Sequence, residues 1–144
     1  MRTITSLLLL ISVTATMLTS CTKFDEGPGL SLRSAESKLD GDWIVLKATE
    51  ADGDDATDLF ANFTYTFTKD GVFRYRFEQG NFGFDAVGAY SFNKDSNVLS
   101  TTATYEFQGL PITDEETVTV LRLTPDELII LTEDGGRIEY QRPA

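Results

Sequence analysis

The residues that could do covalent chemistry in this chain are few. Cys21 is the only cysteine among 144 residues, and the chain contains no histidine. Because histidine is the commonest general base and a common metal ligand, most nucleophilic and metal-dependent mechanisms lack a central residue. Two carboxylates could still act as a glycosidase pair, but no two are marked as partners. We therefore predict that the chain is not an enzyme and has no catalytic residue, no metal and no cofactor.

The neighbours of Cys21 indicate a different role for its thiol. Arg2 gives a short positive start, residues 7–18 form an apolar stretch, and Leu18-Thr19-Ser20 leads into the cysteine. The stretch is roughly half the length that spans a bilayer, so residues 1–20 are expected to be a cleaved signal peptide. The pattern resembles bacterial lipoprotein signals, which implies that Cys21 carries palmitate-type acyl chains. The alternative is an ordinary secretory signal that leaves Cys21 as a free thiol.

The lipoprotein resemblance implies that a membrane is one partner of the protein. We expect Cys21 to anchor it in the outer membrane of the cell envelope, on the periplasmic or the outer face. Residues 21–37 contain Gly27-Pro28-Gly29 and no sustained periodicity, which predicts an acylated tether. The acidic pair in Lys23-Phe24-Asp25-Glu26 resembles the surface-export signals of some Bacteroidetes lipoproteins, or is a solvated linker.

The charge of the chain limits its other partners. The formal net charge is −11, and it becomes −12 without the signal peptide, which contains one arginine and no acidic residue. An acidic surface repels phosphate backbones, so we expect no nucleic-acid partner. Nothing in the sequence identifies a protein partner.

Apolar residues recur at period two from Leu39 onward, which predicts strands with one buried face. Trp43 and Val45 alternate along a first strand, and two aromatic strands at 63–67 and 73–77 flank a hairpin turn at 69–71. Further strands are predicted at 87–92, 98–107, 117–123, 128–132 and 137–141, with a loop at 108–116.

Eight strands joined mostly by short turns favour one fold. Residues 38–144 are predicted to form an all-β domain, an eight-stranded antiparallel up-and-down barrel, because closure removes the two exposed edges of a meander. An open sandwich of the same strands is the alternative.

Two short segments resemble a known family. Gly41-Asp42-Trp43 resembles the Gly-x-Trp motif of lipocalins, and residues 39–43 with 65–71 look like the lipocalin-like lipoprotein domains of Bacteroidetes. The resemblance implies a barrel whose Trp43 closes one end under an arginine near the last strand. Arg142 fits that place better than Arg137. The chain is shorter than typical lipocalins and shows no helix after the last strand, and both departures argue against a roomy cavity.

The inward-facing aromatic residues are the candidate ligand-binding set. A lining of this kind suits a small hydrophobic ligand, but the preferred interpretation of the rings is that they fill a small core, which would leave a structural or protein-interaction lipoprotein. The set comprises Phe63, Tyr65, Phe67, Phe73, Tyr75, Phe77, Tyr90 and Phe92.

Three remaining segments have both a functional and a simpler interpretation. Asp52, Asp54, Asp55 and Asp58 could attract calcium but lack a known ligand spacing, so a solvated loop is expected, as it is for residues 114–116. The glycine-rich residues 80–84 could form a mobile lid, but a plain connection that buries Phe82 or Phe84 is the preferred interpretation.

Overall fold

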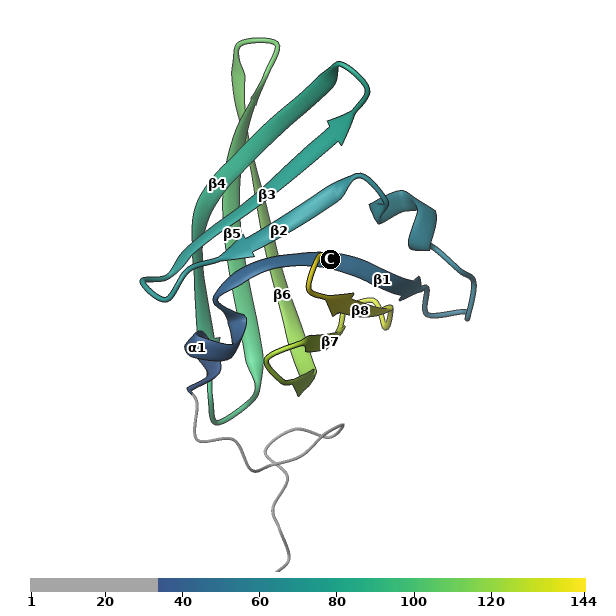
Figure 1. Ribbon diagram of the computed structural model, residues 1–144, viewed down its shortest axis with the longest axis vertical. Coiled ribbons are helices and arrows are strands. Elements are labelled where there is room, and N and C mark those ends of the chain that lie inside the picture. Colours follow the sequence, from purple (N-terminus) through teal and green to yellow (C-terminus); the bar gives the residue numbers. More distant parts are fainter. Residues whose placement is uncertain (1–33) are drawn as a thin grey trace, which may run out of the picture.

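Eight strands close into one antiparallel barrel in the computed structural model, which describes residues 34–144 (Figure 1). Each strand pairs with its neighbours in sequence, and β1 pairs with β8 to complete the ring. The strands are β1 (Gly41–Thr49), β2 (Phe63–Phe67), β3 (Val72–Gln79), β4 (Phe82–Asn93), β5 (Val98–Phe107), β6 (Leu110–Leu123), β7 (Glu127–Leu131) and β8 (Arg137–Gln141). The predicted up-and-down barrel is confirmed, and the open sandwich is wrong.

The aromatic hairpin has the register that its alternation predicts. Tyr65 of β2 lies opposite Tyr75 of β3, and Phe67 lies opposite Phe73, so their side chains share the inner face. Gly71 ends the turn between the two strands with a φ of +92°, a conformation that glycine adopts without steric cost.

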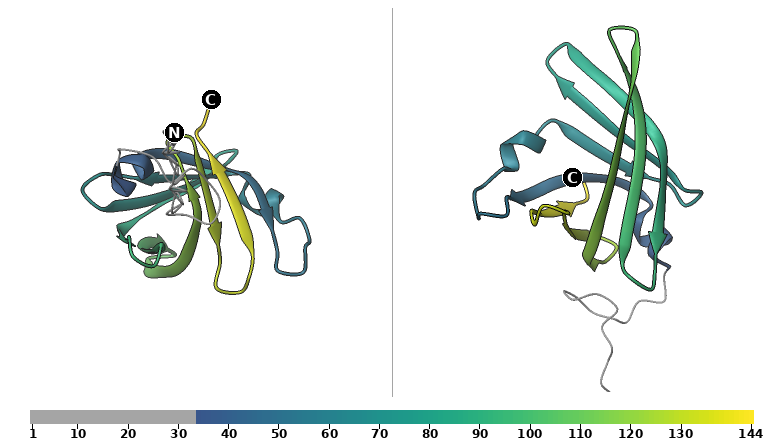
Figure 2. Two further views of the ribbon diagram at one scale, coloured as in Figure 1. Left: turned by 90° about the horizontal axis from the view of Figure 1, so that it is seen from below. Right: turned by 180° about the vertical axis from the view of Figure 1, so that it is seen from behind.

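The strands differ in length, and this difference shapes the barrel. The hairpins β3–β4 and β5–β6 extend beyond the rest of the barrel, as the right-hand view of Figure 2 shows. β6 pairs with β7 only over residues 119–123, whereas it pairs with β5 from Leu110 onward. The wall is therefore open at the side, between the first part of β6 and the turn that joins β7 to β8.

A short helix, which the sequence analysis did not predict, closes the end of the barrel at which β1 begins. Helix α1 (Ala35–Leu39) begins after Ser34, whose hydroxyl accepts a hydrogen bond from the backbone N–H of Ser37 at 3.1 Å. Ala35 and Leu39 are buried against the barrel. The core beneath the helix is almost entirely apolar: Trp43, Phe67, Phe73, Tyr90, Leu99, Val118, Val120, Leu123, Leu128 and Ile130.

Strand β6 is longer than predicted, and the expected loop at 108–116 is wrong. Gln108 and Gly109 both have positive φ, at 52° and 78°, and form the tight turn from which β6 starts. Pro111 is tolerated because this part of β6 has no partner on the β7 side to which a backbone N–H would donate. The acidic residues 114–116 therefore belong to a strand of the barrel wall.

Strand β4 is also longer than predicted, because Phe82 and Phe84 belong to it. A short turn at Gly80 and Asn81 connects β3 to β4, so the mobile-lid interpretation of residues 80–84 is wrong. Phe84 packs on Phe77, with ring centroids 5.7 Å apart, while Phe82 stays 60% exposed. The preferred interpretation is correct in that no lid is present, but both residues lie in a strand, and Phe84 is only partly buried.

Candidate ligand-binding cavity

Trp43 and Arg142 meet at the closed end of the barrel. The indole of Trp43 is fully buried and donates its Nε1–H to the backbone oxygen of Leu39, at 2.8 Å. The guanidinium carbon of Arg142 lies 3.8 Å from the centroid of the Trp43 ring, in a cation–π contact. The hydrogen bond ties α1 to the first strand, and the guanidinium covers the ring from outside.

The guanidinium of Arg142 also holds three segments of backbone together. It donates to the carbonyl oxygens of Lys38 at 2.7 Å, Asp42 at 3.2 Å and Pro125 at 2.9 Å. These bonds join the helix, the start of β1 and the turn between β6 and β7. Burial lowers the pKa of Arg142, the effect expected when a cation loses water.

Gly41 has to be a glycine for Arg142 to lie there. Its φ is +113°, and a Cβ at this position would come within 2.9 Å of Nη1 of Arg142. The other candidate, Arg137, forms an ion pair with Glu139 at 3.2 Å, away from the indole. Arg142, and not Arg137, is therefore the arginine that covers Trp43 at the closed end.

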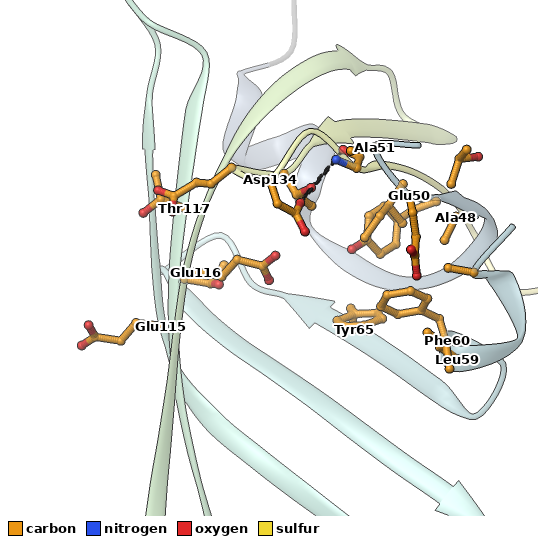
Figure 3. A pocket seen from close by; sticks show the side chains of 18 of the residues that line it. Ala48, Glu50, Ala51, Leu59, Phe60, Tyr65, Glu115, Glu116, Thr117 and Asp134 are labelled. Atoms are coloured by element: carbon orange, nitrogen blue, oxygen red, sulfur yellow. Dashed lines mark hydrogen bonds between the residues drawn. The ribbon is translucent and has the colours of Figure 1, made fainter. Parts of the chain in front are cut away.

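A broad cavity of about 970 Å³ lies at the opposite ends of β1 and β7 from α1 (Figure 3). It is bounded by the segment after β1, by the 3-10 helix η1 (Thr57–Phe60), by the β7–β8 turn and by the middle parts of β5 and β6. This volume lies in the range of small-molecule sites. The roomy cavity that the short chain argued against is therefore present.

Most of the predicted ligand-binding aromatic residues do not line this cavity. Of the eight, only Tyr65 does so. Phe67, Phe73 and Tyr90 are buried in the closed end, and Phe92 packs against that core. The others pack on one another along β2 to β4, where Phe63 and Phe77 lie 5.0 Å apart between centroids.

Tyr75 points into the barrel and makes a polar contact there. Its hydroxyl donates to a carboxylate oxygen of Asp114 on β6. Burial raises the pKa of Tyr75, and the bond to Asp114 raises it further. Two strands that are not neighbours in the sheet are thereby joined across the interior.

The cavity itself is acidic. Six of its lining residues are Asp or Glu, and none is Lys or Arg. In Figure 3, Glu50, Glu116 and Asp134 extend into the same space above Tyr65 and Phe60, whereas Glu115 points to the other side of β6. The loop interpretation of residues 114–116 is wrong because they belong to β6, and Glu116, although exposed, faces the cavity.

Glu116 is the carboxylate on which this environment acts most. Burial raises its pKa, and the negative charges of Asp134, Asp114 and Glu133 raise it further. Asp134 differs, because hydrogen bonds from the Thr132 hydroxyl and the Gly136 N–H lower its pKa. The charged form of Asp134 is thus stabilised by its neighbours, whereas the charged form of Glu116 is not.

Two tyrosine hydroxyls share the cavity with Glu116. The rings of Tyr65 and Tyr140 meet edge to face, with centroids 5.4 Å apart. Burial raises the pKa of both, well above the ordinary value for Tyr140. Within residues 34–144, neither hydroxyl nor the Glu116 carboxylate has a hydrogen-bond partner. Glu116 is exposed and the two tyrosines are partly exposed, so all three groups can hydrogen-bond to a molecule that enters the cavity.

The acidic loop after β1 is held by its own side chains. Asp55 accepts hydrogen bonds from the Thr57 backbone N–H at 2.9 Å and from its hydroxyl at 2.6 Å, which lowers the pKa of Asp55. Asp52 accepts from the N–H of Asp54 at 3.0 Å. Over the described residues, no three Asp, Glu, His or Cys side chains are grouped to hold a metal ion.

Comparison with known proteins supports the fold. No protein-family model matches the chain, and no curated protein does. A solved lipocalin-like protein from Bacteroides uniformis superimposes with a TM-score of 0.58 at 19% identity, covering 74% of this chain and 99% of that one. The chain has a lipocalin-like barrel fold. An uncharacterized protein from Bacteroides eggerthii has the same arrangement, with a TM-score of 0.57, 18% identity and coverage of 73% and 99%.

The lipocalin-like resemblance read from Gly41-Asp42-Trp43 is confirmed at the level of the fold. The predicted signal peptide, the tether up to residue 33 and Cys21 lie outside the described residues. No helix among residues 34–144 has the length and apolar character required to cross a bilayer.

Sequence reasoning missed the most distinctive residues of the cavity, Glu116 and Tyr140. Their signal was present: Val120, Val118, Glu116 and Asp114 continue one period-two face, which the acidic run concealed. Tyr140 alternates with Ile138 on the last strand in the same way.

Proposed function

We propose that the protein is an envelope lipoprotein whose barrel binds a small molecule in the open cavity. The observation that carries the proposal is a cavity of about 970 Å³ beside a closed, well-packed core. Sites of this size, with apolar walls and a few converging polar groups, are typical of small-molecule binding.

The walls of the cavity have both kinds of surface that a ligand needs. Leu59, Phe60 and Ile138 supply apolar area, and Leu59 is 69% exposed at the mouth. Tyr65, Tyr140 and Glu116 supply polar groups without partners in the described part of the chain. The aromatic rows of β2 to β4 fill the neighbouring interior, so they act as a wall rather than as the site itself.

The anchor in this proposal is acylated Cys21. One acyl chain holds a protein only marginally, whereas two or more give stable attachment, since each buried CH₂ contributes about 0.8 kcal/mol. The chain enters the barrel at α1, the closed end (Figure 1). The cavity lies at the opposite end of β1 from α1.

Two experiments test the two parts separately. Radiolabelled palmitate fed to bacteria that express the full chain should label the protein, and Cys21→Ser should abolish the label. An unlabelled wild-type protein overturns the anchor. Native mass spectrometry of gently purified protein should reveal a mass excess that organic extraction removes. A mass equal to that of the bare chain argues against a tightly held ligand.

A second function is favoured by the tips of the long hairpins. Phe82, Phe107 and Leu110 are 60%, 51% and 67% exposed and lie at the two turns that extend from the barrel. Exposed apolar side chains at such positions suit a protein contact. Crosslinking in the envelope should then capture one partner, and Phe107→Ser should remove it. The cavity would in that case be incidental.

A further inference from the structure

The charges that line the cavity define a class of ligand more narrowly than its size does. Six of the lining residues are Asp or Glu and none is Lys or Arg, and of these six only Glu115 is seen to point to the other side of β6. An anion or a fatty acid would enter this space against like charge, at an energetic cost in a site partly shielded from water. A cation would be attracted.

Acidic residues alone would make only a solvated surface, and the tyrosines point to more than that. The Tyr65 and Tyr140 rings meet edge to face at 5.4 Å, and both line the cavity beside Glu116. Aromatic faces attract ammonium groups, by about 0.5–2 kcal/mol each. Neither hydroxyl has a protein partner over residues 34–144, so each oxygen can accept a hydrogen bond from an N–H donor.

The opposite wall supplies a place for an apolar body. Its apolar residues come from β1, from β8, and from η1 with the residue before it: Ala48, Ile138, Ala56, Leu59 and Phe60. Burying an alkyl or aryl group there removes apolar surface from water, including part of the exposed Leu59. The cavity therefore combines acidic groups with an apolar surface at η1, above which Glu50 also extends.

We propose that the cavity binds an organic ammonium ion with an apolar body. The ammonium group lies between Glu116 and the Tyr65–Tyr140 pair, and the body packs on η1. This inference rests on the proposed function, because it assigns a ligand class to the same cavity. It also replaces the neutral hydrophobic ligand expected from the sequence with a charged amphiphile.

Calorimetric titration of the purified protein with three six-carbon probes tests the inference. Hexylammonium, hexanol and hexanoate share a chain and differ in the charge of the head group. We expect hexylammonium to bind at least about tenfold more tightly than hexanol, and hexanoate to bind weakest. Glu116→Gln should reduce the affinity for hexylammonium about fivefold or more and leave hexanol within about twofold.

A matched variant controls for net charge. Glu106→Gln removes the same charge from an exposed position on β5 that does not line the cavity, and it should leave all three affinities unchanged. If hexanol binds as tightly as hexylammonium or more tightly, or if Glu116→Gln and Glu106→Gln change the affinities alike, the proposal of a cationic ligand is overturned. The proposed binding function then still stands. If no probe binds, both are overturned.

Discussion

The guanidinium of Arg142 covers the indole of Trp43 at 3.8 Å and, through three carbonyl oxygens, ties α1, β1 and the β6–β7 turn into one closed end. The two residues are 99 positions apart, Trp43 on the first strand and Arg142 directly after the last. Their contact lies at the end of the β1–β8 pairing where Ile44 is opposite Gln141. The opposite end of the same two strands opens into the acidic cavity.

Arg142→Lys should destabilise the barrel by about 2 kcal/mol, because an ammonium cannot stack on the indole and reach three carbonyls at once. Urea unfolding followed by Trp43 fluorescence measures the loss. Arg76→Lys is the control, since Arg76 makes only exposed ion pairs with Glu78 and Asp85 and should change stability by less than about 0.5 kcal/mol. Equal effects of the two variants would contradict the closing role.

Tyr75→Phe should cost about 1 kcal/mol or less, because it removes one hydrogen bond to Asp114, which water can reach. Tyr105→Phe is the matched control. Its ring packs on Phe84 with centroids 4.8 Å apart, but its hydroxyl has no partner among residues 34–144. Thermal unfolding of both variants checks the difference, and a larger loss in Tyr105→Phe would contradict it.

Gly88→Ala should destabilise the protein by at least about 2 kcal/mol. A Cβ on Gly88 would lie 1.9 Å from the carbonyl oxygen of Thr102, so β4 and β5 would have to move apart. Gly53→Ala separates this clash from backbone strain, because Gly53 has a φ of +98° with no atom near its missing Cβ, and should cost only about 1 kcal/mol. Denaturant midpoints give the comparison, and the reverse order would refute the close approach.

Glu116→Gln should stabilise the folded protein at neutral pH. Folding raises the pKa of Glu116, so the native state prefers the protonated form, and stability from this group is lost as pH rises through the folded pKa. The groups around it are Asp114, Glu133 and Asp134, all acidic. The gain in the variant should therefore shrink as the pH falls through the raised pKa, and vanish below the ordinary pKa of 4.5. A gain that grew on acidification would contradict the sign.

The sequence predicted the barrel because its alternating aromatic strands leave one consistent inner face. Phe67 and Phe73 lie where period-two spacing and the Asp70-Gly71 turn place them. Gly41, Trp43 and Arg142 were assigned their role from the family resemblance, and the structure brings them together at the closed end. These features depend on local pattern or on a motif, both of which a single sequence carries.

The cavity was harder to predict because its residues come from five separate segments. Glu116 looked solvated within an acidic run, since period two was not followed through Pro111 and the charges. Tyr140 and Phe60 gave no sign of their proximity to Tyr65, which depends on how β8 and η1 close over β2. The volume of the cavity follows from the unequal lengths of the strands. Residues in the turns, such as Gln108, determine where those strands begin and end.

The central claim is that a small amine occupies the cavity, and a two-dimensional amide NMR titration with hexylammonium tests it most directly. We predict saturable shift changes at Ala48, Thr101, Glu116 and Gly136, which line the cavity, with Val120 and Leu123 of the closed end unchanged. Shifts confined to the hairpin tips at Phe82, Phe107 and Leu110, or no saturable shifts at all, would contradict it.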